Sequence, residues 1–440
     1  MIVWDWGRMW LAVIAGLATA SVYAEGVLKN GWIEAVLLAL ILVYLVTPRI
    51  NITLQNLLIG LTAVCLTVTC TDLLLRPVMG SRLHSTPMNV YTRKLPQLPA
   101  VGRWDPNVSI TAAAYGDLAA MTGDVTLREP RTIEFQTDSA GFRNTSIAQP
   151  IETLVLGDSF GAGAGTTQDR VVSRLLETRY GHTTYNLSFP ASGPWQQYVN
   201  FAIESPRLTL ASNAVVVWLL YTGNDLDDDY GDTWRLEELP WKSGFHAWKV
   251  AYKTYRGRSP LHQLTDNLRR RFKRPEGLAA NVVTTTLPDG RPVLFLKNQE
   301  EWSERSRDEV KRHHNFPKLR RTMEAMKRLV EEKGLKIVIV VLPTKGEVYP
   351  WVFHRRSTVT ENSAPSGFSQ AVLSTCDEFH LPCFDAKPYF MQAAGRLWSS
   401  SGGLLWWRDD THLDEHGHEV LAEFIAREVL PAYHSDVTPM

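Results

Sequence analysis

The stretch TLVLGDSF at residues 153–160 joins a short apolar run to a turn of Gly, Asp and Ser. The run Thr153–Leu156 is typical of a buried strand, and the turn residues that follow it indicate where the strand ends. Glycines at positions 161, 163 and 165 allow a tight backbone path directly after the serine. Because ligands bind beyond the carboxyl ends of the strands in a parallel α/β sheet, we expect Ser159 to be exposed at a functional edge, near a helix N-terminus.

Further apolar runs predict the rest of this sheet. Strands are expected at residues 184–187, 214–221, 336–342 and 383–385, and amphipathic helices at 318–333 and 417–431. Strands that alternate with helices indicate a mostly parallel sheet covered on both faces. About 110 residues separate the third strand from the fourth, which is more than one crossover helix needs. We therefore expect an insertion at about 226–330, which would either cap the site or rest on a membrane.

The N-terminal part of this 440-residue chain predicts a membrane anchor. Three apolar stretches lie at residues 9–24, 32–47 and 57–75, and a hydrocarbon core of ~30 Å needs ~20 helical residues. We expect about three transmembrane helices within residues 1–76, followed by a linker and lead-in at 77–135. A cleaved signal peptide in the first stretch and ordinary soluble core helices are the two alternatives.

Composition and cysteine usage exclude some classes of protein. Lys plus Arg and Asp plus Glu each number 46, so the basic excess typical of nucleic-acid-binding proteins is missing. The 4 cysteines form no pattern typical of a metal site. Cys376 and Cys383 would form a disulfide if their domain lies outside the cytoplasm, or would be two buried free thiols.

A serine hydroxyl becomes an effective nucleophile only when a base removes its proton. The candidate base is His412, in the sequence Asp409-Asp410-Thr411-His412. A preceding carboxylate that accepts a hydrogen bond from Nδ1 fixes the tautomer of such a histidine. We expect Asp409 to have this role, while Asp410 is the near alternative and would otherwise cap the next helix. The competing interpretation of His412 is an ordinary surface histidine.

Acyl transfer also needs hydrogen-bond donors directed at the developing oxyanion. The candidates are the backbone N–H groups of Ser159 and Gly193 and the side-chain amide of Asn224. Each is commonplace at a strand end when taken alone. The prediction rests on all of these elements falling at strand ends in one order along the chain.

That order resembles the four sequence blocks of the SGNH (GDSL-like) hydrolase superfamily over about residues 136–433. The blocks are Gly157-Asp158-Ser159, Gly193, Gly223-Asn224-Asp225 and Asp409-x-x-His412, and Gly141-Phe142-Arg143 resembles the lead-in of many members. The resemblance implies a three-layer α/β/α sandwich with a five-stranded parallel sheet of flavodoxin-like type at 136–440. It also implies a triad of Ser159, His412 and Asp409, an oxyanion hole of Ser159, Gly193 and Asn224, and no metal or organic cofactor.

A second resemblance concerns the substrate. The segment LPTKGEVY at residues 342–349 resembles a stretch in family members tied to acylation of cell-envelope polysaccharides. It implies Lys345 and Tyr349 as substrate contacts, although the alginate-acetylating members carry their Asp-His pair before the serine and this chain carries it last. Trp195, Trp406 and Trp407 would stack on a sugar ring or belong to the core and rim. The resemblance also places the domain in the periplasm or outside the cell.

Three functions follow as hypotheses. The first is a membrane-anchored serine esterase acting on O-acyl groups, above all O-acetyl groups, of an envelope glycan or lipid. The second is an O-acyltransferase that modifies an exported polysaccharide, and the third is an inactive anchored scaffold or carbohydrate-binding subunit. A complete nucleophile, base and oxyanion set argues against the third. The expected partners are the acylated glycan or lipid, the membrane and other envelope biosynthesis proteins, and no nucleic acid.

Overall fold

The computed structural model describes residues 87–145, 149–239, 241–257, 279–354 and 363–434, with four isolated helical positions between 67 and 75. The chain divides into two compact units, one comprising Met1–Pro99 with Trp241–Arg274 and the other Ala100–Pro240 with Pro275–Met440. In the described part of the chain, no helix has both the length and the apolar character needed to cross a membrane. The predicted anchor, apart from the four positions above, lies outside the described residues.

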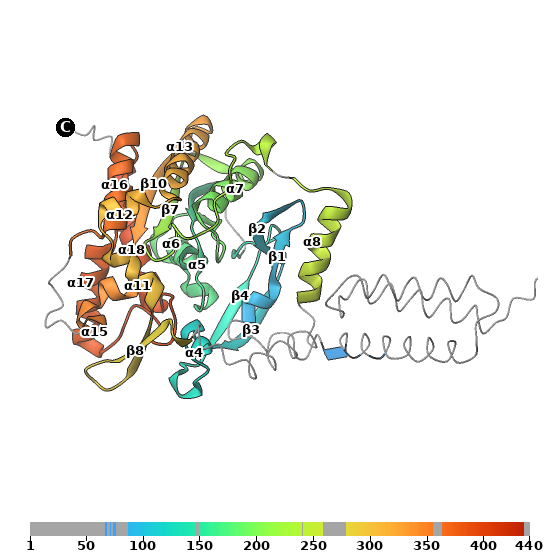
Figure 1. Ribbon diagram of the computed structural model, residues 1–440. Coiled ribbons are helices and arrows are strands. Elements are labelled where there is room, and N and C mark those ends of the chain that lie inside the picture. The colour runs from blue at the N-terminus through green and yellow to red at the C-terminus, as the bar shows by residue number, and fades with distance from the viewer. Residues whose placement is uncertain are drawn as a thin grey trace, which may run out of the picture. The chain divides into compact units, whose positions relative to one another are not determined.

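A five-stranded parallel sheet forms the centre of the second unit (Figure 1). Its order is β11-β10-β7-β5-β6, with bounds β5 Ile151–Leu156, β6 Thr184–Asn186, β7 Leu210–Tyr221, β10 Lys336–Leu342 and β11 Cys383–Asp385. All five predicted strands are confirmed. β5 and β7 begin earlier than predicted, at residues 151 and 210, because their first residues are less uniformly apolar than the runs that follow.

The strand order creates a topological switch point between β5 and β7. The chain leaves β5 toward β6 on one side and later returns to β7 on the other side of β5. In flavodoxin-like sheets of this order, ligands bind beyond the carboxyl ends of the two strands that flank the switch point. Ser159 follows β5 and Asn224 follows β7, so the fold brings both to this edge.

Helices cover both faces of the sheet, as the alternation of strands and helices predicted. Val217 and Leu219 of β7 face an apolar cluster with α6 (Val172–Tyr180), α17 (Lys387–Ser401) and α18 (Glu415–Phe424). On the other face, the Nε1–H of Trp218 donates to Oε1 of Gln197 at 2.6 Å. Gln197 belongs to α7 (Pro194–Glu204), which packs against α13 (Phe316–Glu332). The unit is therefore a three-layer α/β/α sandwich.

Ordered elements occupy the segment that was predicted to be a linker and lead-in. Strands β3 and β4 form an antiparallel pair with a register from Ser109↔Gln136 to Ala114↔Arg131, and α4 (Asp117–Thr122) lies between them in sequence. Their bounds are β3 Ser109–Ala114 and β4 Arg131–Gln136, while β1 (Thr92–Leu95) and β2 (Leu98–Trp104) form another two-stranded sheet. These strands are short and only alternately buried, which explains their weak apolar signal in the sequence.

The region predicted as an insertion contains elements of both units. α8 (Gly244–Gly257) lies in the first unit, where it packs against β1. In the second unit, β8 (Val282–Thr286) and β9 (Pro292–Leu296) form an antiparallel hairpin, followed by α11 (Lys297–Glu304) and α12 (Arg307–Arg312). The backbone N–H of Leu294 donates to the carbonyl of Arg408 at 2.8 Å, so this hairpin supports the loop that carries His412.

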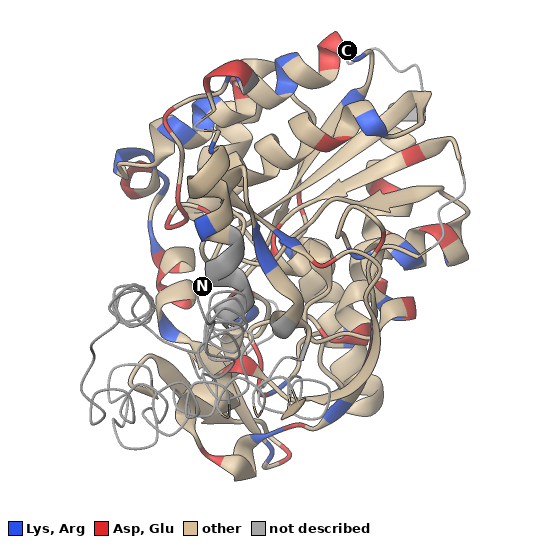
Figure 2. Cartoon of the chain, turned by 90° about the vertical axis from the view of Figure 1, so that its right-hand side faces the viewer, with Lys and Arg blue, Asp and Glu red and all other residues tan. Residues whose placement is uncertain are grey.

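Two further sequence expectations concern charge and cysteines. Segments with Lys or Arg and segments with Asp or Glu are both spread over the ribbon in Figure 2, and the formal net charge of the sequence is zero. Cys376 on α16 (Gly367–Phe379) and Cys383 on β11 are free thiols in the structure. The alternative of two free cysteines is therefore the one that the structure contains.

Replacing Ile339 by Ala tests the central packing of the sheet. Ile339 lies in β10 between β7 and β11 and is completely buried, so its truncation leaves a cavity and lowers the free energy of unfolding by about 2–5 kcal/mol. Denaturant titration of the full chain measures this change. The control is Val125→Ala at a residue with 64% exposure, which changes stability by less than about 0.5 kcal/mol.

Candidate active site

The turn that carries Ser159 is built by the residues around it. β5 ends at Leu156, and α5 (Ser159–Ala162) begins two residues later. The carboxylate of Asp158 caps this helix by accepting the backbone N–H of Phe160 at 2.9 Å. Ser159 is thus the first residue of a helix, where backbone N–H groups have no intrahelical acceptor and an anion is favoured.

The buried side chain of Arg143 hydrogen-bonds backbone carbonyl groups that follow Ser159 in the turn. Nη2 of Arg143 donates to the carbonyl of Thr166 at 2.6 Å, and Nη1 donates to the carbonyl of Ala162 at 3.3 Å. The neighbouring Asn144 accepts the backbone N–H of Asn186, at the end of β6, at 2.8 Å. The Gly-Phe-Arg-Asn lead-in recognised in the sequence therefore fixes the backbone on which Ser159 lies.

The imidazole of His412 lies beside this turn. The ring centroids of His412 and Phe160 are 5.6 Å apart, and Phe160 is the next residue after Ser159. The hydroxyl of Thr166 also donates to the carbonyl of Leu413 at 3.2 Å. The predicted nucleophile and the predicted base are therefore on segments that contact each other at the switch point.

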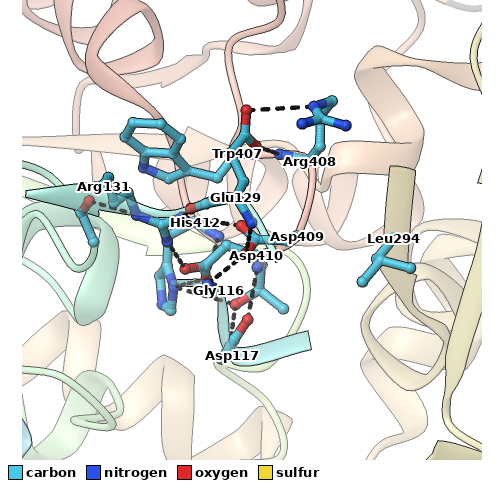
Figure 3. A network of polar contacts seen from close by, with 12 residues as sticks. Gly116, Asp117, Glu129, Arg131, Leu294, Trp407, Arg408, Asp409, Asp410 and His412 are labelled. Carbon is cyan, nitrogen blue, oxygen red and sulfur yellow. Dashed lines mark hydrogen bonds and ion pairs between the residues drawn. The ribbon is translucent and has the colours of Figure 1, made fainter. Parts of the chain in front are cut away.

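The carboxylate that contacts His412 belongs to Asp410 and not to Asp409 (Figure 3). Oδ1 of Asp410 lies 2.7 Å from Nδ1 of His412. Burial alone would lower the pKa of His412, but the negative charge and hydrogen bond of Asp410 raise it to about 9. Burial opposes ionisation of Asp410 as well, yet the charge of His412 holds the pKa of Asp410 well below its usual range. The arrangement fixes the tautomer that leaves Nε2 free to accept a proton.

Asp409 has a structural role that its spacing from His412 did not suggest. Its Oδ2 accepts the backbone N–H groups of Gly116 at 2.7 Å and Glu129 at 2.8 Å. Gly116 must be glycine here, because a Cβ would lie 1.9 Å from the carbonyl oxygen of Asp409. The side chains of Asp409 and Asp410 point in different directions, and only that of Asp410 reaches His412. The spacing of the two residues from His412 in the sequence could not predict this. Asp410 caps no helix either, since Asp414 caps α18 by accepting the N–H of Gly417 at 2.9 Å.

Arg131 joins the two carboxylates. Nη1 lies 2.9 Å from Oδ1 of Asp409, and Nη2 forms a short ion pair with Asp410. The guanidinium carbon also lies 4.3 Å from the centroid of a Trp407 ring. Sequence reasoning missed Arg131, because it begins β4 in the lead-in and belongs to no motif that could have marked it.

The structure contradicts the expectation that Lys345 and Tyr349 contact substrate, because both side chains are buried. Nζ of Lys345 donates to the carbonyls of Trp407 at 2.7 Å, Leu294 at 2.9 Å and Asp410 at 3.2 Å. The Tyr349 hydroxyl accepts the backbone N–H of Leu405 at 2.7 Å. Both residues therefore position the loop that carries His412, since they satisfy backbone groups that would otherwise be buried without partners.

The three tryptophans differ in their surroundings. Trp195 is 3% exposed and donates Nε1–H to the carbonyl of Thr233 at 2.8 Å. Trp406 is 1% exposed and packs edge-on against Tyr349. For these two residues the core alternative holds. Trp407 is half-buried and remains the one of the three that has surface for a sugar ring.

The predicted oxyanion donors are not equivalent. The N–H of Gly193 already donates to Oε1 of Gln196 at 2.8 Å in the first turn of α7. Asp228 packs against Gly193, where an added Cβ would lie 2.4 Å from the Cβ of Asp228. Asn224 lies beside Asp158 and carries a buried oxygen without a hydrogen-bond partner. The Ser159 N–H therefore stays a predicted donor. The Asn224 amide group hydrogen-bonds the Asp158 carboxylate, which leaves its second N–H for an oxyanion, whereas the single N–H of Gly193 is engaged.

Paired substitutions separate the two carboxylates. Asp410→Asn removes the charge that faces Nδ1, so kcat for a small acyl ester falls by about 10²- to 10⁴-fold. Both variants weaken a buried ion pair with Arg131, so each lowers the free energy of unfolding by about 2–4 kcal/mol, but Asp409→Asn keeps the charge beside His412 and lowers kcat far less. Ester kinetics and denaturant titration of both variants provide the measurements. If Asp409→Asn gave the larger loss of kcat at unchanged stability, Asp409 would be the partner of His412.

Comparison with known proteins agrees with this architecture. Residues 294–438 match the family model described as the SGNH hydrolase-like domain of acetyltransferase AlgX. No curated protein matches the chain. Two solved structures show a distant likeness. One is a Bacteroides fragilis protein proposed to be an acylhydrolase, with 10% identity, a TM-score of 0.31, and coverage of 66% of this chain and 91% of that chain. The other is protein YXIM from Bacillus subtilis, with 11% identity, a TM-score of 0.33, and coverage of 79% and 81%.

The two structural likenesses are too weak to support an argument. The family match covers the end of β9, all of β10 and β11, and the loop with Asp410 and His412. The five-stranded parallel sheet and the serine turn at the end of β5 extend the same pattern to the rest of the second unit. Residues 294–438, about a third of the chain, are therefore similar to the SGNH hydrolase-like domain of acetyltransferase AlgX.

Proposed function

We propose that this protein is a serine enzyme that transfers an acyl group through a covalent intermediate on Ser159. The observation that carries the proposal is the His412–Asp410 pair, 2.7 Å apart, on a segment that contacts the serine turn at the switch point of the sheet. Ser159 is the nucleophile, His412 the general base and Asp410 the residue that orients the imidazole. The acyl-modifying character agrees with the matched family.

The chemistry proceeds in two halves. His412 takes the hydroxyl proton of Ser159 as its oxygen attacks the ester carbonyl, and the tetrahedral oxyanion is stabilised by the Ser159 N–H and the Asn224 amide. Collapse expels the alcohol, which receives the proton from His412, and leaves an acyl-enzyme. An incoming hydroxyl then gives its proton to His412 and attacks the acyl carbonyl. As the ester bond to Ser159 breaks, His412 returns that proton to the serine oxygen, which restores both residues.

The incoming hydroxyl distinguishes an esterase from a transferase. Water gives hydrolysis, and a sugar hydroxyl gives an O-acylated glycan, with every named residue in the same role. The matched family model is described as an acetyltransferase, which favours transfer of an acetyl group to a polysaccharide over simple hydrolysis. A scaffold without activity has no need of a buried Asp-His pair beside a capped serine, so we rank that function last.

The site of action is part of the proposal. The three apolar stretches before residue 76 have the composition of membrane spans. We infer that they anchor the enzyme and that the second unit works at the envelope side of the membrane, on a glycan or lipid that carries acyl groups.

Acceptor dependence tests this function. We expect the full-length chain, incubated with an acetyl ester donor, to form O-acetylated glycan when a polysaccharide is present and little free acetate. Mass spectrometry of the glycan and an acetate assay measure both products. Free acetate at the same rate with and without any acceptor would instead establish an esterase.

Two serine variants complete that experiment. Ser159→Ala removes the nucleophile and lowers both products by about 10⁴-fold or more. Ser139→Ala, at an exposed serine of the same unit, leaves them unchanged. Parent activity in folded Ser159→Ala protein contradicts the assignment of the nucleophile.

The pH dependence of the reaction reports on His412. Only neutral imidazole accepts the serine proton, and the Asp410 charge raises the pKa of His412 to about 9 against the effect of burial. We expect kcat/KM to increase as pH rises from about 6 and to level off above about pH 9. A plateau that begins near pH 6.5, the usual pKa of histidine, would show that Asp410 does not act on His412 in solution.

A further inference from the structure

Asp117 brings a second carboxyl group to the His412 loop from a distant part of the chain. It is the first residue of α4, in the lead-in that precedes the sheet. Its Oδ1 accepts the backbone N–H of Thr411 at 3.0 Å, and its Oδ2 accepts the Thr411 hydroxyl at 2.8 Å. Thr411 lies between Asp410 and His412 in sequence, so Asp117 holds the residue that joins the two.

This carboxyl group also lies next to the charges of the site. One oxygen each of Asp117 and Asp410 and one ring nitrogen of His412 lie within 4.8 Å of one another. The Thr411 hydroxyl is 3.3 Å from Nδ1 of His412. A negative charge on Asp117 would therefore act on His412 over a distance at which Coulomb interactions in proteins remain strong.

The two carboxyl groups differ in their preferred protonation. Burial, followed by the charge of Asp410, raises the pKa of Asp117 to about 7. Asp410 remains ionised because His412 and Arg131 both favour its charged form. Two carboxylates this close to each other do not both ionise freely. At neutral pH, Asp117 is thus close to its own titration while Asp410 holds a permanent charge.

A bound metal ion is a competing explanation for two carboxylates and a histidine. One oxygen of Asp410 already faces His412, and the other forms an ion pair with Arg131. The Lys345 ammonium group is also within 3.2 Å of the carbonyl oxygen of Asp410. A divalent cation at this position would compete with both positive groups, so the surroundings favour a proton rather than a metal between the carboxyl groups.

We propose that Asp117 is a positioning residue of this active site, which holds Thr411 in place and adds a second negative charge that His412 experiences. The inference rests on the proposed function of Ser159 and His412, and it extends the site to α4. Asp117 acts through Asp410, Thr411 and His412 and touches no reacting atom in this scheme. Neutral Asp117 leaves His412 with the single charge of Asp410, whereas ionised Asp117 makes the imidazolium more stable and the base less available.

Other titratable groups also face His412 and Asp117 and influence the pKa of each. His412 is influenced by Asp158 at the end of β5 and by His418 on α18. Asp117 is influenced by Asp410 and His412, and it lies near the buried hydroxyl of Tyr221. Asp117 in turn influences Asp410 and Tyr221, so the comparison of Asp117→Asn with Asp117→Glu is needed to attribute a change in pH dependence to the charge at position 117.

The test measures the pH profile of Asp117→Asn. Asparagine keeps an oxygen for the Thr411 N–H and an amide that can donate to Asp410, but it removes the charge. The midpoint of the rise in kcat/KM with pH then shifts downward by about 0.5–2 pH units. Asp117→Glu restores the charge and returns the midpoint toward that of the parent. Asp169→Asn, at a side chain with 71% exposure, leaves the profile unchanged.

A second measurement avoids the unidentified natural substrate. The rate at which a fluorophosphonate probe labels Ser159 depends on His412 as base, so its pH profile shifts in the same direction in Asp117→Asn. A uniform loss of rate at every pH with an unchanged midpoint, in protein that melts like the parent, overturns the proposal and leaves only a structural role. Labelling or turnover that survives in Ser159→Ala overturns the proposed function instead, and the two failures are therefore distinguishable.

Discussion

The buried pairing of Arg131 with Asp409 and Asp410 is the interaction on which the candidate site depends. Three charged groups are removed from water here, at a cost that only close ion pairs and additional hydrogen bonds offset. Arg131 provides both, with Asp409 at 2.9 Å and the carbonyl of Gly165 at 3.1 Å. Because Asp410 is held on the side of Arg131, its other oxygen faces His412, and the loop cannot turn without breaking a buried ion pair.

This interaction also explains why the lead-in belongs to the enzyme. Gly116 and Glu129 donate their backbone N–H groups to Asp409, and Asp117 accepts from Thr411. The segment around β3, α4 and β4 thus encloses one side of the His412 loop, while the β8–β9 hairpin and Lys345 support the other. The parallel sheet carries the turn with Ser159. The lead-in segment, the β8–β9 hairpin and Lys345 hold the loop that orients His412.

Much of the fold could be predicted because its signals are local. Continuous apolar runs marked the central strands β7 and β10, since a strand buried on both faces has few polar positions. The rule that ligands bind at the carboxyl ends of parallel strands then located Ser159 and Asn224. The short strands of the lead-in were missed because partial burial leaves small and polar residues in them. Lys345 and Tyr349 were predicted as substrate contacts from resemblance, and Trp195 and Trp406 were left between sugar stacking and the core, because neither resemblance nor residue type reveals burial.

The sequence by itself determined the order in which the candidate catalytic residues occur along the chain. The serine follows the first strand of the sheet, and the histidine lies on the loop after the last strand. Only the tertiary structure decided which aspartate faces His412. Asp409 and Asp410 are adjacent and chemically identical, so their roles depend on the direction of each side chain. That direction is set by Arg131, which is 278 positions from Asp409, and a contact between such distant residues leaves no trace in local spacing.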